Sequence, residues 1–352
     1  MKLDERIRRQ ARELGFDLAG IAPVRPAVRG AEFRRWLDRG FAGGMGWMGN
    51  TRAARCDPSR VLPGAKSAVV VGLGYRMQDP PPELWNDPLR GRVARYAWGR
   101  DYHDVMRPML EALADFIAAA SGRPVAWKAF ADSGPVMERD LAERAGLGFP
   151  GKNTNLIHPR IGSQFFIGEL LLDRELDFDT PPAMPSCGAC SACLSACPTG
   201  ALVAPRILDA RRCISYFTIE HRGAIPEALR PRMGNWVFGC DECQQVCPWV
   251  LQAGGRPPPP HAGRFLRFDP DVCAPRLVDL VALDETRFKE RFAGTPLLRA
   301  RRSGFLRNVA VALGNSRHPD ARAGLEQLSG DADAGVREHA RWALDFPGTD
   351  AM

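Results

Sequence analysis

The chain has 352 residues, of which 45% are hydrophobic and 25% are charged, and its formal net charge is +7. These are the proportions of an ordinary globular protein, and the length allows two or three domains with sizeable cores. No run of about 18 apolar residues exists, which excludes a membrane-spanning helix of the usual kind. The positive charge would suit a polyanionic partner such as nucleic acid, but it discriminates weakly by itself.

The N-terminal region predicts short helices and strands in alternation. Apolar residues at helical spacing indicate amphipathic helices at 3–16 and 31–39, with a short strand at 18–22 between them. The charged start of the chain lacks the apolar stretch of a signal peptide, so we expect no export signal.

Three apolar runs predict further strands, and two helices separate them. The strands are expected at 65–73, 125–130 and 164–172, where β-branched and aromatic residues are frequent. The helices are expected at 104–121 and 135–145. This mixture predicts an α+β fold for the first half of the chain.

The second of these strands delivers the segment Asp132-Ser133-Gly134-Pro135. Gly134 suits a turn, and Pro135 suits the first position of the following helix. Asp132 would therefore lie between a strand end and a helix start. It is either a functional carboxylate or a helix cap, and the local sequence does not separate the two.

Two segments imitate nucleotide-binding motifs and fail in context. Residues 44–49 match G-x-G-x-x-G but follow a helix instead of a strand, with no βαβ unit around them. Residues 146–153 match G-x-x-x-x-G-K, but Asn153 stands where a P-loop needs Ser or Thr, and a helix precedes the segment. Neither dinucleotide nor ATP binding is predicted.

The segment Asp101-Tyr102-His103 begins like the D-x-H-x-x-G signature of cobalamin proteins that bind cobalt through histidine. Met106 replaces the glycine of that signature, and its other parts are missing. We therefore interpret His103 as a hydrogen-bonding residue at a helix start.

Eight of the ten cysteines lie in two runs and one isolated position between 187 and 247. The first run has the spacing C-x₂-C-x₂-C-x₃-C-P that binds [4Fe–4S] clusters in bacterial two-cluster ferredoxins. The second run ends in the same way, but Val237 occupies the place of its first cysteine, so we assign that place to Cys213. The predicted ligand sets are Cys187, Cys190, Cys193 and Cys247 for one cluster, and Cys197, Cys213, Cys240 and Cys243 for the other.

Zinc and disulfides are the alternatives for these cysteines. Zinc sites usually take four ligands in two separated pairs, which does not explain two runs that end in Cys-Pro. A disulfide framework belongs to small secreted domains.

Two [4Fe–4S] clusters need a reducing compartment, so we expect a cytoplasmic protein. Cys56 and Cys273 lie outside the runs and are interpreted as incidental thiols.

A Gly- and Pro-rich linker at 254–260 separates the cysteine-rich segment from a helical C-terminal part. Helices are predicted at 305–314, 319–328 and 334–345. Similar sequences, FLRNVAVAL and VREHARWAL, open two of them at a spacing near that of two-helix repeats. The pattern predicts a short HEAT-like module.

Several motifs now occur together: ARYAWGRDYH, FADSGPVMERDLAERAGLGFPGKN, IGSQFFIGEL, the double cluster pattern, RRCISYFTIE and GCDECQQVCPW. In this combination the sequence resembles the epoxyqueuosine reductase family over about residues 5–345. The resemblance implies a cobalamin-binding catalytic α+β domain at 1–180, a ferredoxin-like double [4Fe–4S] domain at 181–255, and a linker with a HEAT-like tRNA-binding domain at 256–352.

The resemblance also implies an activity, with cobalamin in its cob(II)alamin form and two [4Fe–4S] clusters as cofactors. The enzyme would reduce epoxyqueuosine to queuosine at the wobble position of tRNAs for Asn, Asp, His and Tyr. Its partners would be the anticodon stem-loop and an unidentified electron donor, with no membrane, and the family behaves as a monomer. The main alternative is a reductive dehalogenase-like enzyme that acts on a small molecule.

Site residues follow from the same resemblance. Asp132 matches the family's proton donor, provided that burial near the corrin favours its neutral form. Arg139 matches a basic residue near the substrate. The positions that match cofactor contacts are Arg55, Asp132, Leu156, His158, Ile167, Ser215 and Asp241. General rules of RNA recognition add a set of candidate contacts, each of which is individually more often a surface charge than a contact: Arg139, Arg212, Arg301, Arg302 and Arg307.

Overall fold

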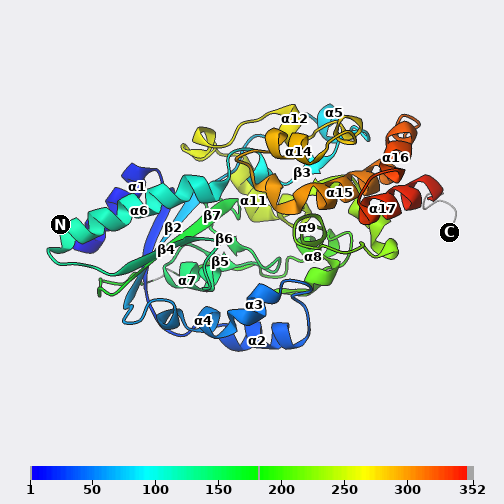
Figure 1. Ribbon diagram of the computed structural model, residues 1–352. Helices are drawn as coiled ribbons and strands as arrows, with labels where there is room; N and C mark the ends of the chain where they lie inside the picture. The colour runs from blue at the N-terminus through cyan, green and yellow to red at the C-terminus, as the bar shows by residue number, and fades with distance from the viewer. Residues whose placement is uncertain (1, 181–182, 347–352) are drawn as a thin grey trace.

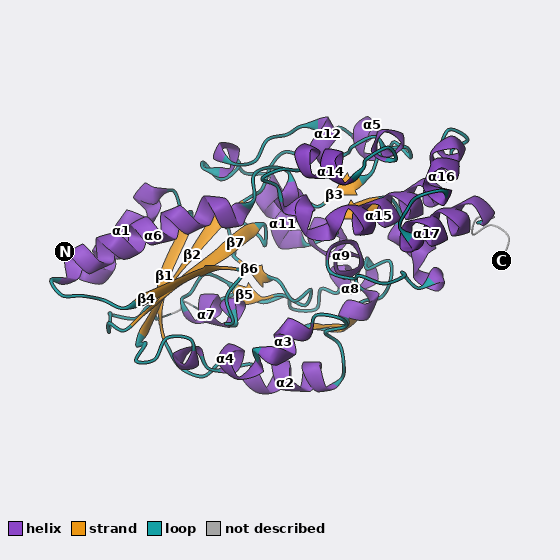
Figure 2. Ribbon diagram, viewed as in Figure 1, coloured by secondary structure: helices purple, strands orange, loops and turns teal. Residues whose placement is uncertain are grey.

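The computed structural model describes residues 2–180 and 183–346, and it combines helices and strands as expected (Figure 1, Figure 2). A β-sheet with covering helices occupies one end of the molecule, and the C-terminal helices occupy the other. The cysteine-rich segment lies between them. Within the described residues, no helix has the length and apolar character needed to cross a membrane.

A four-stranded antiparallel sheet organises the N-terminal region, in the order β1-β2-β7-β4. Its strands are β1 (Leu18–Pro23), β2 (Ser67–Gly74), β7 (Phe165–Leu172) and β4 (Trp127–Ala131). All four lie within two residues of the predicted bounds. Every residue of β2 is buried, because helices cover the sheet on both faces.

The two faces of the sheet have separate cores. On one face, α1 (Leu3–Leu14) and α6 (Tyr102–Ser121) pack on alternate residues of β2 that include Val69 and Val71. On the other face, α7 (Glu138–Arg144) packs on Ala68 and Val70. Figure 1 shows α1 and α6 on one side of the strands and α7 on the other.

The helix predicted to begin at Pro135 begins at Glu138 instead, so that prediction was wrong. The reason lies in the turn before it. Asp132 has a φ of 60°, and the Ser133 N–H donates to the Ala131 carbonyl at 2.7 Å, which closes a three-residue turn. The Val136 carbonyl then accepts a hydrogen bond from Arg55 at 3.0 Å. The chain between 132 and 137 is therefore irregular.

Short elements fill the rest of the chain up to residue 291. The helices are α2 (Gly30–Asp38), α3 (Gly46–Asn50), α4 (Arg52–Cys56), α5 (Pro82–Trp85), α8 (Ala192–Ser195), α9 (Ile214–Ile219), α10 (Glu242–Gln245), α11 (Pro248–Gly254), α12 (Pro270–Cys273), α13 (Leu277–Leu280) and α14 (Glu285–Arg291). The strands are β3 (Arg92–Val93), β5 (Phe149–Pro150), β6 (Leu156–Ile157), β8 (Leu202–Ala204), β9 (Ile207–Leu208) and β10 (Trp236–Phe238).

Three longer helices form the C-terminal part: α15 (Arg301–Ser316), α16 (Ala321–Ser329) and α17 (Ala334–Asp345). They match the three predicted helices, although α15 begins four residues before the predicted start at 305. Their core also contains Trp98 from the N-terminal region and Phe238 from the cysteine-rich segment. The HEAT-like character and the three domain boundaries stay predictions.

Asn308 and His339 tie the C-terminal helices to the cysteine-rich segment from fully buried positions. The Asn308 amide donates to the carbonyls of Thr218 and Val237 at 3.0 and 2.9 Å. His339 Nε2 accepts the Ile225 N–H at 3.0 Å, and its Nδ1 donates to a backbone carbonyl of its own helix. The imidazole is therefore neutral in this arrangement.

Protonation of His339 should loosen this junction. Burial lowers the pKa of His339 to about 4, and the charge of Arg230 contributes. Because the unfolded value is near 6.5, the stabilising effect is complete above pH 6.5 and is lost as the pH falls toward 4. Over that pH range we expect the unfolding free energy of the wild type to decline. This decline should exceed the decline of His339→Gln by on the order of 2 kcal/mol.

Urea denaturation at several pH values measures this difference. The matched control is His318→Gln, since the His318 side chain is 37% exposed and the same substitution there should leave the decline unchanged. A His339→Gln protein that keeps the whole decline would contradict the assignment.

Candidate active site and cysteine centre

The eight predicted cluster ligands come from three segments, around α8, before α9 and around α10, and none of them forms a disulfide. Cys193 interacts with Cys187, Cys247 and Cys190, which is the first predicted set. Burial raises the pKa of the Cys193 thiol, and these neighbours add to the effect.

The second predicted set is also together. Burial raises the pKa of Cys240 and Cys243, and Cys213 interacts with both. Cys243 interacts with Cys197 as well, and with Cys193 of the first set. The two groups of thiols are therefore neighbours, as a relay of electrons between two clusters requires.

Lys152 holds the first cysteine loop. Its ammonium donates to the carbonyls of Gly188 and Cys190 at 2.8 and 2.7 Å, and its backbone N–H points to Cys187 Sγ at 3.4 Å. The segment that imitated a P-loop thus contacts the cysteine loop. The Ala201 N–H similarly donates to Cys197 Sγ at 3.2 Å.

Polar side chains join the end of the sheet to the second cysteine run. Gln244 Oε1 accepts hydrogen bonds from the hydroxyls of Tyr75 and Ser163, at 3.4 and 2.9 Å. Asn153 donates to the Cys243 carbonyl at 3.2 Å. The cysteine centre is therefore connected directly to the strands that carry Asp132.

Asp132 is held in place by the turn and by Tyr102. Its left-handed backbone conformation is unfavourable for an aspartate, and such strain concentrates at functional sites. Gly134 is required beside it, because a Cβ there would lie 2.4 Å from the Phe130 ring. The Tyr102 hydroxyl donates to Asp132 Oδ2 at 2.6 Å, and the buried Tyr102 ring stacks on Phe166 at 4.1 Å.

The predicted burial of Asp132 is not provided by the protein, since the residue is exposed. The residue projects from the strand end on a turn instead of lying beneath the helix that follows. Tyr96 interacts with Asp132 from the sheet side and with Asp241 from the cysteine-rich segment, so the two carboxylates face a common region.

Asp241 and Arg55 are both buried and hydrogen-bonded. Asp241 accepts the Arg95 N–H at 2.7 Å, and burial raises its pKa to about 6. Arg55 donates to Thr51 Oγ1 at 2.9 Å and lies over the Trp47 ring. Its charge acts on Asp132 from the opposite side of the turn.

The other predicted cofactor contacts are distributed around this region. Leu156 and Ile167 contribute to the core beneath α7. His158 Nδ1 accepts the Arg160 N–H at 3.2 Å, and burial lowers the His158 pKa to about 4, so its Nε2 carries the proton near neutral pH. Ser215 lies in α9. In the described part of the chain, no hydrogen bond joins His158 or Ser215 to the other predicted contacts.

His103 behaves as interpreted. Asp101 caps α6 by accepting the His103 N–H at 3.0 Å, and His103 Nδ1 lies 2.7 Å from the same carboxylate oxygen. Cys56 and Cys273 lie away from the cysteine centre, the first beside Gly30 and the second in the C-terminal core.

The predicted RNA-contacting arginines differ in their exposure and in their hydrogen-bond partners. Arg139 is exposed and donates to the Thr154 carbonyl at 2.7 Å, and Arg212 is exposed. Arg301 and Arg302 line a cavity of about 820 Å³. The prediction was wrong for Arg307, which is 4% exposed and donates to buried carbonyls, because α15 turns its side chain toward the cysteine-rich segment.

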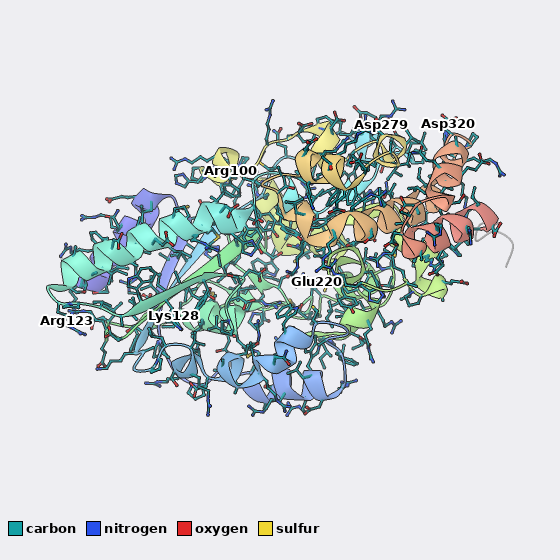
Figure 3. All side chains as sticks on the ribbon, in the orientation of Figure 1. Arg100, Arg123, Lys128, Glu220, Asp279 and Asp320 are labelled. Carbon is teal, nitrogen blue, oxygen red and sulfur yellow. The ribbon has the colours of Figure 1, made fainter. Side chains whose placement is uncertain are left out.

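The sequence patterns did not single out several residues that the structure places in this region. Tyr102 stands inside the ARYAWGRDYH motif, but only the fold shows that it reaches Asp132. Glu220 and Arg299 form a two-contact ion pair at 2.9 Å across the junction with the C-terminal part. Figure 3 places Glu220 at the centre of the molecule. Glu169 is a single charge in an otherwise apolar strand, which was a usable signal.

Comparisons with known proteins agree with this arrangement. The family "Epoxyqueuosine reductase QueG, DUF1730" matches residues 55–133, and the "4Fe-4S double cluster binding domain" matches residues 186–250. The curated epoxyqueuosine reductase of Xanthomonas campestris pv. campestris is 46% identical over 343 residues, which cover 96% of this chain and 94% of the relative. The chain belongs to the epoxyqueuosine reductase family.

Other members of the family are similar over the same length. The Escherichia coli epoxyqueuosine reductase is 38% identical over 97% of this chain and 89% of its own. A crystal structure of an epoxyqueuosine reductase with an epoxyqueuosine-modified tRNA-Tyr stem loop superposes with a TM-score of 0.86 and 32% identity, over 97% of this chain and 89% of that one. The enzyme is therefore an oxidoreductase, and the predicted iron–sulfur and queuosine-related assignment is confirmed.

Loss of the Lys152 ammonium should weaken the first cysteine loop of this reductase. We expect Lys152→Met to retain closer to four than to eight irons after anaerobic reconstitution, since about four irons belong to each cluster. Iron and sulfide analysis measures this. Lys66→Met is the matched control, because Lys66 is exposed and far in sequence from the eight predicted cluster ligands, and it should bind iron as the wild type does.

Proposed function

We propose that this protein reduces epoxyqueuosine to queuosine at the wobble position of tRNA, in the tRNAs for Asn, Asp, His and Tyr. The observation that carries the proposal is the similarity, over 97% of the chain, to an epoxyqueuosine reductase solved with an epoxyqueuosine-modified stem loop. The physiological electron donor is a separate protein, and the reductase acts as a monomer in the cytoplasm.

The cysteine pattern and the matched double-cluster family support two [4Fe–4S] clusters. Two neighbouring groups of four cysteines supply the donors, and backbone N–H groups point at the sulfurs, which is the environment that tunes such clusters. We assign one cluster to Cys187, Cys190, Cys193 and Cys247, and the other to Cys197, Cys213, Cys240 and Cys243. The clusters would deliver electrons one at a time to the region that Asp132 faces.

The residues near Asp132 fit a large cofactor with many amide groups. Buried polar groups from both sides, Arg55 and Asp241, are combined with apolar positions of the sheet domain. We propose that cobalamin is held by Arg55, Asp132, Leu156, His158, Ile167, Ser215 and Asp241. Bound cobalamin would supply a strongly reducing cobalt centre, which amino-acid side chains cannot provide. The neutral His158 offers its Nε2–H as a donor to a cofactor carbonyl.

Asp132 would be the proton donor. Opening an epoxide leaves negative charge on oxygen, which a positioned acid must neutralise. Asp132 is exposed toward the region between the sheet and the cysteine centre, and Tyr102 fixes the orientation of its carboxyl group. An epoxyqueuosine reductase from Bacillus subtilis with a TM-score of 0.83 is described with its catalytic aspartate loop swung out of the active site. A strained three-residue turn would permit the same motion here.

The substrate would be recognised through phosphates and unstacked bases. The exposed Arg139 lies seven residues after Asp132, and its guanidinium is fixed by the Thr154 carbonyl. Arg301 and Arg302 at the C-terminal cavity would contact the stem at a distance from the reacting base. Arg302 is already paired with Asp331, so we expect Arg301 to contribute more.

Substitution of Asp132 tests the catalytic role. We expect Asp132→Asn to keep its clusters and cofactor but to convert epoxyqueuosine tRNA about 10² to 10⁴ times more slowly, because it cannot release a proton. The measurement is nucleoside analysis of the tRNA after anaerobic turnover. Asp115→Asn is the matched control, because Asp115 is exposed on α6, and this variant should be fully active.

The same assay separates the proposal from its alternative. A reductive dehalogenase-like enzyme would leave the tRNA unchanged and would consume electrons with a halogenated small molecule instead. Wild-type rates for Asp132→Asn would show that another group donates the proton.

A further inference from the structure

The proposed reaction needs more protons than Asp132 carries. Converting an epoxide to an alkene and water consumes two electrons and two protons: one proton when the ring opens, and one when the hydroxyl leaves as water. The clusters deliver the electrons one at a time. Asp132 can donate the first proton, but it must be protonated again while the substrate covers it and excludes water.

Glu169 is an unused acid whose charge interacts with that of Asp132. It lies in the middle of β7 and is 0% exposed, and neither of its carboxyl oxygens has a hydrogen-bond partner in the described structure. An unpaired buried carboxylate would cost several kcal/mol, so the group is stable there only in its neutral form.

The strand register places Glu169 near the end of the sheet from which Asp132 projects. Glu169 is paired with Phe130 on β4, so the two side chains share the face that α7 covers. Asp132 follows two residues later, on the turn that leaves β4, and its charge acts on Glu169.

Glu138 is a third acid in the same region. It begins α7, and its side chain is 19% exposed. It interacts with both Glu169 and Asp132. The three carboxyl groups thus interact with one another and range from the buried Glu169 to the exposed Asp132.

The other charged groups near Glu169 have interaction partners of their own. Arg55 of α4 acts on all three carboxyl groups, but its guanidinium hydrogens bond to Thr51 and to the Val136 carbonyl. Lys128 of β4, labelled in Figure 3, donates to the Val61 carbonyl at 2.8 Å. On α7, Asp140 pairs with Arg144, and Arg139 acts on Glu138; β2 presents the apolar Val70.

We propose that Glu169 and Glu138 are a proton reservoir that protonates Asp132 again within each turnover, after it has given its first proton to the substrate. This inference rests on the proposed function. In the transfer, Glu138 releases its proton to the Asp132 carboxylate and takes one from Glu169, and Glu169 regains a proton from solvent after the product leaves. No electrons move among the three groups.

The electrostatics agree with this arrangement. Burial raises the pKa of Glu169 well above its ordinary value, and the charges of Glu138 and Asp132 add to the effect, against Arg55. Burial also raises the pKa of Glu138, although Arg139 opposes it. Both groups therefore hold protons at a pH where an ordinary carboxyl group has lost its own.

The test compares holoenzymes of the wild type, Glu169→Gln and Glu169→Asp. Glutamine has nearly the shape of the neutral acid but cannot release a proton. We expect Glu169→Gln to lower kcat at least about tenfold, with unchanged KM for the modified stem loop and unchanged iron and corrin content. The solvent hydrogen isotope effect on kcat should rise, and Glu169→Asp should restore part of the rate.

A second readout is independent of turnover. Infrared spectra of the wild type at neutral pH should contain carbonyl stretches of buried protonated carboxylic acids, and the component that belongs to Glu169 should be missing from Glu169→Gln. Glu143→Gln is the matched control, since Glu143 also lies on α7 but pairs with Arg29. It should keep both the band and the rate.

The outcomes separate the inference from the proposed function. A wild type that leaves epoxyqueuosine tRNA unchanged overturns the function. A wild type that converts it, but has no protonated-acid band, overturns only the reservoir, as does a Glu169→Gln protein with the rate of the control. If Glu169→Gln does not fold, Glu138→Gln takes its place in the kinetic comparison, and the wild-type band still decides.

Discussion

The architecture depends on the contacts that hold the cysteine-rich segment between the sheet and the C-terminal helices. The segment has a small core of its own around Ile214, Phe217 and Trp236, and it contacts the sheet domain through a cluster around Phe149, Ile157 and Val250. Polar contacts fix its orientation: Gln244 accepts hydrogen bonds from hydroxyls at the sheet end, and Asn308 donates into the segment from α15. Because these contacts are buried and directional, they set the position of the thiols relative to Asp132 more exactly than apolar packing alone could.

The antiparallel sheet then determines where chemistry can occur. Its strand ends bring Asp132, Tyr75 and Phe165 to one edge, and the cysteine centre lies against that edge. An electron path from the thiols and a proton path along β7 and α7 would therefore meet at one carboxylate. If electrons come from the thiols and protons come from the sheet side, the substrate can occupy the space between these two sources.

Long-range contacts also explain why the C-terminal helices cannot be considered separately. Trp98 and Phe238 belong to the same core as α15 to α17, and Glu220 is paired with Arg299 across the junction. A change in the pH-sensitive contact of His339 would thus be transmitted to the segment that carries Cys213. The RNA binding proposed for the C-terminal helices would therefore be connected to the cysteine centre through this junction.

The sequence by itself determined the strands of the sheet, the double-cluster cysteine pattern and the family, since these depend on local composition and spacing: runs of apolar and β-branched residues define a buried strand, and short gaps between cysteines are typical of a cluster-binding segment. It also placed Asp132 at a strand end. Only the tertiary structure decided that Asp132 is exposed on a strained turn, that α7 starts at Glu138, and that Arg307 is buried. It alone brought Tyr102 to Asp132 and left Glu169 buried and unpaired, because strand register and helix packing join residues that are far apart in the chain, and no local pattern records which side chains they bring together.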